Sequence, residues 1–316
     1  MGSTDGGPAD AGSLDGDECV ALRARLAAAA SATHVTVTDD HVLLTVGDVL
    51  RILRATGSDV TEVGTFEPGE GALGRVRAEG DRAFVSTGSA VLVVDVSEPT
   101  APAEVGRVPD LRLGDFTVSA NVLYLVTDVG SGASDWQLAL VDVADPSDPL
   151  PRGAVSLGAF APLGGGINDV VVSDGLLVVS GSGVRDGTVM VVDASDPDAP
   201  AVTASVEMHR PEDLAVFGEQ VYIGGNDLRR LDVGDPSAPE GPFEVGRGRM
   251  LAPDGRYLYA VGVLRAYDVA APTAPVLRWE YLDTGAITDF DVRASVAYLV
   301  DSSEGLLVFD LPCEAP

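Results

Sequence analysis

The segment Val91 to Asp95, with the sequence VLVVD, recurs along the chain, and this repetition constrains the fold more than any other feature. Five further copies also end in an aspartate: Asp142, Asp193, Asp232, Asp268 and Asp310. A weaker seventh copy has Leu53 in place of the aspartate, and the copies follow one another at intervals of 36 to 51 residues. A period of about 40 residues rich in valine, leucine and turn residues is typical of propellers and other stacked arrays. The chain of 316 residues is therefore predicted to be one array of seven units rather than two ordinary domains.

Each unit has the pattern of four short β-strands. From His34 onward, alternating apolar runs are interrupted every eight to twelve residues by turn signals such as Asp-Gly and Asp-Pro. In the third unit we expect strands near residues 115–119, 122–127, 138–143 and 150–155. Four antiparallel strands in seven copies, with almost no helix, predict an all-β fold. The prediction is a seven-bladed β-propeller whose repeats cover about residues 34–312.

The recurring aspartate is expected to have a structural role. It ends the third strand of its unit, and in most copies prolines follow about four and seven positions later. An ionised aspartate at that place accepts hydrogen bonds from loop N–H groups, while the prolines lock the loop. We favour this reading over calcium binding even where Asp193, Asp196 and Asp198 gather, because proline stands where a calcium loop needs a flexible backbone.

The two ends of the chain differ in character from the repeats. Apart from Met1, residues 1–18 contain Leu14 as their one sizeable apolar side chain, so we predict a flexible N-terminal tether. The propeller is expected to cover residues 19–316, with residues 19–30 closing the ring. Because the seventh unit supplies only three strands, we expect Val20 to Leu26 to pair antiparallel with Leu306 to Asp310 as its fourth. The alanine-rich sequence of this segment also fits a helix, and it does not decide between the two.

Cys19 and Cys313 are the only cysteines, and they lie at opposite ends of the predicted propeller. In the expected pairing the chain leaves the third strand of the last unit at Cys313 and enters the fourth at Cys19, on the same face. This brings the two cysteines within reach of a disulfide. Such a bond requires an oxidising compartment. Together with the absence of a hydrophobic leader, this predicts a secreted, periplasmic or cell-surface protein whose signal peptide has been removed. Two free thiols in a cytosolic protein are the alternative.

The repeat motif resembles a known family, the LVIVD repeats of bacterial and archaeal secreted or surface propellers. The residues that carry the resemblance are VLVVD, LALVD, VMVVD, LRRLD, LRAYD and LLVFD, most of them followed by an Asp-Pro turn. The sequence departs from the pattern at Leu53, and at Arg51 and Arg230, where an apolar residue is usual. The resemblance implies an extracytoplasmic propeller, and it supplies no catalytic residues.

Charge and hydropathy exclude several classes of partner. The chain has 49 acidic and 20 basic residues, all of the latter arginine, for a formal net charge of −29. Phosphate backbones are repelled by such a surface, so no nucleic acid partner is expected. No run of about 18 apolar residues is present, which predicts no transmembrane segment. We expect a monomer, tethered to a membrane at most through its N-terminus like a lipoprotein.

One set of polar residues suggests a site. When the first strands of the seven units are aligned, the position before the first apolar residue forms a candidate axial ring: His34, Arg75, Asp115, Asp169, Asp213, Arg249 and Asp289. First strands line the axial channel of a propeller, so these side chains are expected to meet there. Four carboxylates with two arginines and a histidine suit a calcium ion with water, or a small cationic or polar ligand. In the competing interpretation the arginines neutralise the aspartates and the ring is a hydrated structural plug.

Long insertions in the third and fourth units are expected on the same face as the ring. They contain Trp136 and Phe160, which we expect as exposed aromatic anchors, although a tryptophan at the end of a loop also packs back on its blade. No serine-nucleophile, phosphate-loop or metalloprotease motif is present. The sequence therefore predicts an extracytoplasmic binding scaffold for an unknown protein, small-molecule or glycan ligand, with no cofactor assigned. The alternative is a metal-dependent hydrolase or lyase with its site in the axial channel.

Overall fold

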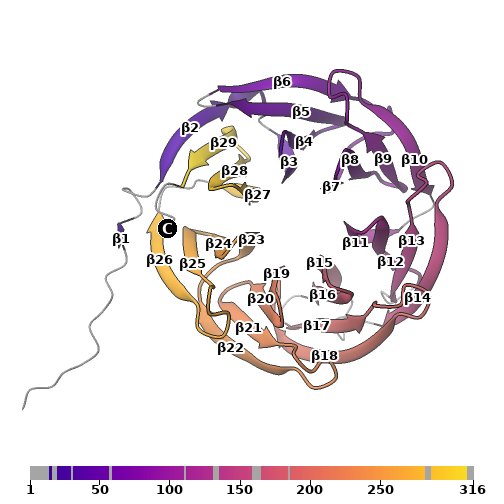
Figure 1. Cartoon of the computed structure of the whole chain (residues 1–316), viewed down its shortest axis with the longest axis vertical. Coiled ribbons are helices and arrows are strands. Elements are labelled where there is room, and N and C mark those ends of the chain that lie inside the picture. The colour runs from indigo at the N-terminus through magenta and orange to yellow at the C-terminus, as the bar shows by residue number, and fades with distance from the viewer. Residues whose placement is uncertain are drawn as a thin grey trace, which may run out of the picture.

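The computed structural model describes residues 14–15, 20–29, 31–56, 59–109, 112–130, 135–158, 165–183, 186–281 and 286–311. Seven blades surround a central channel, and each contains a four-stranded antiparallel sheet (Figure 1). The predicted seven-bladed β-propeller is thus confirmed. No helix in the described part of the chain is long and apolar enough to cross a membrane.

The strands of each blade follow the chain from the channel outward in blades 1 to 6. Those of blades 1 to 3 are β3 (Ala32–Val37), β4 (Val42–Val46), β5 (Val49–Thr56) and β6 (Asp59–Phe66); β7 (Val76–Glu79), β8 (Arg82–Ser86), β9 (Ala90–Asp95) and β10 (Ala103–Pro109); and β11 (Leu113–Ser119), β12 (Val122–Asp128), β13 (Trp136–Asp142) and β14 (Leu150–Gly158). Those of blades 4 and 5 are β15 (Gly166–Ser173), β16 (Leu176–Ser182), β17 (Asp186–Asp193) and β18 (Ala201–His209); and β19 (Asp213–Phe217), β20 (Gln220–Gly224), β21 (Leu228–Asp232) and β22 (Glu240–Gly246). Those of blades 6 and 7 are β23 (Met250–Asp254), β24 (Tyr257–Val261), β25 (Leu264–Asp268) and β26 (Val276–Tyr281); and β27 (Ile287–Arg293), β28 (Val296–Asp301), β29 (Gly305–Asp310) and β2 (Ala21–Leu26).

The repeat motif is apolar at successive positions because its strand is covered on both faces. In β9, Leu92 and Val94 pack in the cluster shared with blade 1, whereas Val91 and Val93 pack in the cluster shared with blade 3. All four side chains are fully buried. Burial of that area, at about 25 cal/mol per Å² of apolar surface, is the main attraction between neighbouring blades.

The N-terminal segment closes the ring as a strand rather than a helix. β2 pairs antiparallel with β29, Ala21 opposite Asp310 and Leu26 opposite Leu306 (Figure 1). Arg23 reinforces the join through an ion pair of 2.8 Å with Asp310. A short 3-10 turn, Ala27–Ala29, then leads into blade 1. The predicted closing segment is therefore confirmed at its predicted register.

Two predictions concern the ends of the chain. Within the predicted tether, β1 (Leu14–Asp15) pairs parallel with β26 opposite Trp279 and Glu280, which makes blade 6 a five-stranded sheet. Cys19 and Cys313 lie outside the described residues, so their disulfide stays a prediction. Ala21 and Asp310, which are paired, stand two and three positions from them in the sequence.

The recurring aspartate has the predicted structural contact. In five of the six copies that end in aspartate, one carboxylate oxygen accepts a hydrogen bond of 2.9 to 3.0 Å from the N–H two residues later: Asp95, Asp142, Asp193, Asp232 and Asp268. Arg256 and Arg278 also pair with Asp268, and together with a backbone hydrogen bond they lower its pKa well below the ordinary value. These turns lie at the end of each blade away from the candidate ring, because strand direction alternates.

Candidate functional site: the axial channel

The inner strands present a row of carboxylates to the channel. Three ring aspartates each accept a hydrogen bond from the inner strand of the next blade: Asp169 from the N–H of Leu214 at 3.0 Å, Asp213 from Leu251 at 2.7 Å, and Asp289 from Val35 at 2.9 Å. An inner strand has no further strand on its axial side, so these N–H groups need another acceptor. The ring aspartates thus fasten adjacent blades together while facing the channel.

A second level of polar residues lies two positions further along the same strands. Asp291 accepts a hydrogen bond of 2.9 Å from the N–H of Val37, repeating the Asp289 contact one step along β27. In the same way, Arg77 on β7 stands two positions after Arg75, which directly precedes that strand. Because side chains two apart in a strand share a face, the Arg-x-Arg and Asp-x-Asp spacings were a signal that the sequence prediction missed.

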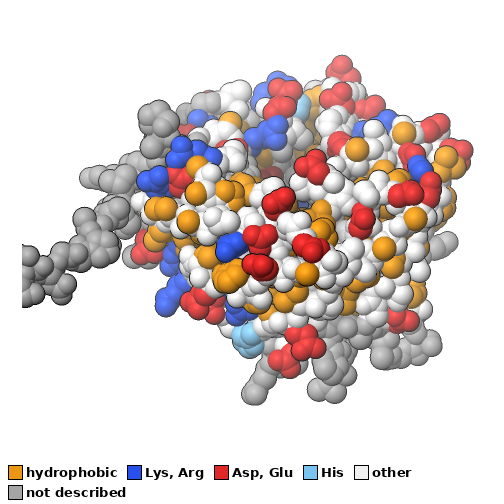
Figure 2. All heavy atoms as spheres, turned by 60° about the horizontal axis from the view of Figure 1, so that its bottom comes forward, with side chains coloured by type: hydrophobic (Ala, Val, Ile, Leu, Met, Phe, Trp, Pro, Cys, Tyr) orange, Lys and Arg blue, Asp and Glu red, His pale blue; other side chains and the backbone are white. Residues whose placement is uncertain are grey.

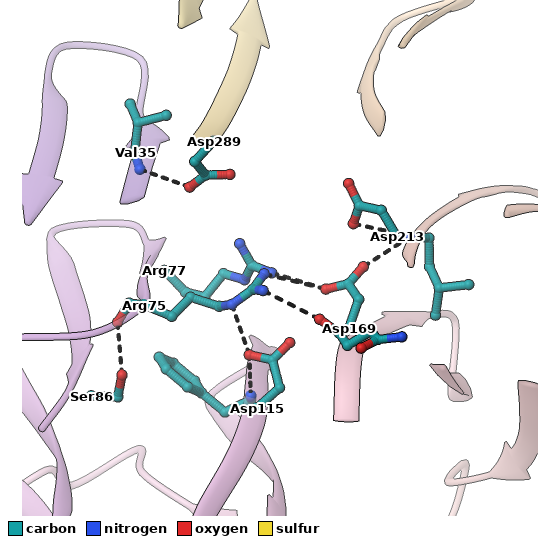
Figure 3. A network of polar contacts seen from close by, with 11 residues as sticks. Val35, Arg75, Arg77, Ser86, Asp115, Asp169, Asp213 and Asp289 are labelled. Carbon is teal, nitrogen blue, oxygen red and sulfur yellow. Dashed lines mark hydrogen bonds and ion pairs between the residues drawn. The ribbon is translucent and has the colours of Figure 1, made fainter. Parts of the chain in front are cut away.

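Arg75 is the central cation of the channel (Figure 3). Its Nε lies 2.8 Å from Asp115 Oδ1, and its Nη1 lies 3.3 Å from Asp169 Oδ1. Arg77 Nη2 also contacts Asp169 Oδ1 at 3.3 Å. The side chains of Asp115 and Asp169 are only 3% exposed, so their charges are compensated by two guanidinium groups rather than by bulk water. Burial lowers the pKa of Arg75, but the surrounding carboxylates of Asp115, Asp169, Asp289 and Asp213 outweigh it and raise the pKa overall.

Burial raises the pKa values of several carboxyl groups around Arg75 and Arg77. That of Asp115 rises to about 6, although Arg75 opposes the shift. Burial, the charge of Asp169 and a hydrogen bond with Asp169 hold the pKa of Asp213 well above its ordinary value. Burial also raises the pKa of Asp289, and that of Asp291 to about 6. The channel therefore contains carboxyl groups that take up protons near neutral pH.

His34 lies at the ring position of blade 1. Burial and then the charges of Arg75 and Arg77 lower its pKa to about 4, so the imidazole is neutral at pH 7. Its Nδ1 is buried and has no hydrogen-bond partner among the described residues. Six predicted ring residues are thus brought to the channel: His34, Arg75, Asp115, Asp169, Asp213 and Asp289.

Arg249 does not occupy the ring position. Asp213 lies four residues before Phe217, which begins the hairpin turn of its blade, and in blade 6 the equivalent residue before Asp254 is Met250. A shift of one residue turns a strand side chain to the opposite face. The Arg249 side chain is accordingly 66% exposed and pairs with Glu212 at the mouth of the channel.

Two hollows that share wall residues occupy the axis. The inner one has a volume of about 310 Å³, and the outer one, at the mouth, about 350 Å³. Arg75, Asp213 and Asp289 line both. The inner wall contains four carboxyl groups and two guanidinium groups, so it is acidic and rich in hydrogen-bond acceptors. In the described part of the chain, no group of three or more histidine, cysteine or acidic side chains is arranged to hold a metal ion.

Neither of the two predicted aromatic anchors is an exposed side chain among the described residues. Trp136 is 8% exposed and packs in the core between blades 3 and 4, with its indole N–H donating to the carbonyl of Gly165 at 3.1 Å. Of the two alternatives left open for Trp136, an exposed anchor and a side chain packed back on its blade, the structure shows the packed one. Phe160 lies outside the described residues. Elsewhere, exposed apolar side chains are scattered among acidic ones on the outer wall (Figure 2).

Comparison with known families and proteins agrees with this architecture. The LVIVD repeat model matches residues 70–110 and 211–245, so the chain carries LVIVD repeats in blades 2 and 5. No curated protein matches the sequence.

Solved structures with a similar fold share little sequence with this chain. The WD40 domain of Neurospora crassa Pan2 has a TM-score of 0.68 at 11% identity, covering 94% of this chain and 97% of that one. A chain of the mitotic checkpoint complex has a TM-score of 0.65 at 12% identity, with 98% and 99% covered. BamB from Moraxella catarrhalis has a TM-score of 0.58 at 14% identity, with 88% and 85% covered. At these identities the likeness establishes the β-propeller fold alone.

Proposed function

We propose that this chain is an extracytoplasmic binding module whose ligand site is the axial channel. The observation that carries the proposal is the inner hollow of about 310 Å³, which is lined by ionisable side chains from several blades and opens at the mouth. Concave sites with a few converging polar groups are where proteins hold small ligands.

The walls of this hollow are fixed before any ligand arrives. Asp169, Asp213 and Asp289 are each held by a backbone N–H of the neighbouring blade. The closing strand β2 completes the last blade, so that each blade lies between two neighbours in the ring. Groups that are already oriented lose little conformational entropy on binding, and this favours a binding role for the channel.

An extracytoplasmic location is part of the proposal. It is supported by the LVIVD repeats and by the pairing of Ala21 with Asp310, which stand two and three positions from Cys19 and Cys313 in the sequence. The acidic surface, with its net charge of −29, disfavours nucleic acid as the partner. The raised pKa values of Asp115 and Asp291 also suit acid–base chemistry, and binding is the function that we propose because the carboxyl groups of the hollow are already held in place.

The proposal is tested by a thermal-shift screen of the purified protein against amines, amino acids, sugars, nucleotides and short peptides. A ligand that binds only the folded state at 100 times its Kd stabilises it by about 2.7 kcal/mol. We expect hits whose shift is lost in Asp213→Asn, which alters the channel, and kept in Asp40→Asn, which alters an exposed site at the opposite end of the blades. Hits that are equally strong in both variants, or no hits at all, would overturn the proposal.

A further inference from the structure

The charges around the inner hollow are unevenly compensated. On the side of blades 2 to 4, Arg75 and Arg77 pair with Asp115 and Asp169. On the side of blades 5 to 7, Asp213, Asp289 and Asp291 also line the hollow, yet none of the three forms an ion pair with a described residue. In Figure 3, Asp213 lies beyond Asp169 as seen from Arg75, whereas Asp289 lies above the two arginines, beside Val35. Among the described residues, no cation pairs directly with these three carboxylates, although Arg75 and Arg77 act on them from a greater distance.

Blade 6, which lies between these carboxylates, leaves room for a cation. Its inner strand places Met250 at the ring position, where blade 2 has Arg75, and Ala252 at the next level, where blade 2 has Arg77. Leu251, Ala252 and Pro253 form part of the wall of the hollow. Small and apolar residues therefore stand where the opposite side of the ring supplies two guanidinium groups.

Asp115 shows independently that the axial cluster lacks hydrogen-bond donors. Its Oδ1 accepts from the N–H of Phe116 and from Arg75, but its Oδ2 is buried without a partner among the described residues. In Figure 3 this free oxygen is turned towards the Asp169 side of the cluster. A buried acceptor that lacks a donor costs about 1 to 3 kcal/mol. Asp115 stands behind the wall of the hollow, and a ligand inside it meets the carboxyl groups of Asp213, Asp289 and Asp291, which suit N–H groups and positive charge.

We propose that the inner hollow binds an organic cation, a guanidinium or primary ammonium group, in front of blade 6 between Asp213 and the pair Asp289 and Asp291. This proposal rests on the proposed function and names its ligand class. Each carboxylate oxygen has two acceptor sites, so the backbone contacts leave positions for the ligand N–H groups. Arg75, held by Asp115 and Asp169, is the intramolecular precedent for such a group.

Binding of this kind is coupled to protons. The pKa values of Asp213, Asp289 and Asp291 are all raised, chiefly by burial, and a cation placed among them lowers these values. The ligand therefore displaces protons on binding. The affinity of the ligand rises with pH between about 5 and 7, because fewer protons have to leave the carboxyl groups at the higher pH.

The test uses a matched pair of probes, butylguanidine and butylurea, which have similar shape but differ in charge. Isothermal titration of the full chain at pH 7 is expected to show binding of butylguanidine and none of butylurea. The affinity for butylguanidine should fall at least about tenfold in Asp213→Asn and in Asp289→Asn, and it should stay unchanged in Asp40→Asn. It should also be weaker at pH 5 than at pH 7.

A second pair of variants keeps the carboxylates intact. Met250→Arg places a tethered guanidinium group at the ring position of blade 6, and we expect it to abolish butylguanidine binding. Met250→Gln, of similar length but neutral, is expected to retain binding. Equal binding of the two probes, or equal binding by these two variants, would overturn the inference. If the ligand screen gives only neutral hits in the channel, the proposed function stands and the cation inference fails. If calcium chloride binds with the same dependence on Asp213 while butylguanidine does not, the occupant is a metal ion and the inference is also wrong.

Discussion

Arg75 of blade 2 reaches Asp169 of blade 4 across a distance of 3.3 Å, passing the intervening blade. On the way its Nε contacts Asp115 of blade 3 at 2.8 Å, so one side chain joins three blades at the axis. Interblade contacts elsewhere in the ring run from an aspartate to the backbone of the adjacent blade. Arg75 is therefore the side chain on which the charge balance of the channel depends most.

Replacing Arg75 with methionine keeps much of its volume but leaves two buried carboxylates without their main partner. Breaking one half of a buried ion pair costs about 3 to 5 kcal/mol, and the lower end applies here because Arg75 is itself 25% exposed. Urea unfolding at pH 7 measures the change. Arg107→Met is the control, since Arg107 pairs with Glu70 and Glu104 at the surface and should cost no more than about 1 kcal/mol. Equal losses in the two variants would contradict the central role of Arg75.

The raised pKa of Asp291 predicts a specific pH dependence. Its folded-state pKa of about 6 lies above the ordinary value of 3.8, so the folded protein binds this proton more tightly than the unfolded chain does. This contribution to the unfolding free energy is present below about pH 4 and is lost as the pH rises to about 6. Asp291→Asn removes the dependence, and its unfolding free energy relative to wild type should rise by about 1 to 3 kcal/mol from pH 4 to pH 7.

Urea unfolding of both proteins at the two pH values gives this difference directly. Asp40→Asn, at an exposed aspartate, should show no comparable trend. A difference between wild type and Asp291→Asn that is the same at pH 4 and pH 7 would show that the carboxyl group is not perturbed.

Gly106 tests the stacking of the blades at their outer edge. A Cβ atom added there would lie 1.5 Å from the carbonyl oxygen of Pro146, in the Asp-Pro turn of the next blade. That oxygen belongs to the backbone, so the two blades must separate to admit a methyl group. Gly106→Ala should destabilise by about 1 to 3 kcal/mol or more in urea unfolding. Gly88→Ala, where a Cβ meets nothing within 4 Å, should change stability by no more than about 0.5 kcal/mol.

The predicted disulfide between Cys19 and Cys313 is tested by thiol titration of the unfolded, unreduced protein. We expect no reactive thiol before reduction and two per chain after it, because Ala21 pairs with Asp310 and these residues stand two and three positions from the cysteines in the sequence. Reduction should lower the free energy of unfolding by up to about 4 to 5 kcal/mol, since the bond closes a loop of nearly the whole chain. Two reactive thiols before reduction would refute the bond and remove one support for an oxidising compartment.

The repeat allowed the fold and most of the ring to be predicted, because hydrophobic period and turn spacing are local properties. The register was lost at Arg249, where Met250, Leu251 and Ala252 are all apolar and no alternation marks which side chain faces the axis. Only the hairpin at Asp254 to Tyr257 fixes it. The sequence left Trp136 between an exposed and a packed position because it begins β13 directly after an insertion, and its burial depends on blade 4.

The hydrogen-bond partners of the ring aspartates could not be predicted from the sequence, for a related reason. The contact from Asp213 to the N–H of Leu251 depends on how two blades stack, and those residues are far apart along the chain. Likewise, the lack of an ion pair at Asp289 follows only when the positions of Arg75 and Arg77, which pair with Asp169, are known. Sequence patterns located the residues, and the stacking of blades determined what each one contacts.

A crystal structure of the protein soaked with butylguanidine tests the central claim most directly. The account predicts a planar guanidinium group in the inner hollow, within hydrogen-bonding distance of Asp213 and of Asp289 or Asp291, beside Ala252. A guanidinium group bound only on the outer wall of the blades, or a hollow that holds only water at a saturating concentration of the probe, would contradict it.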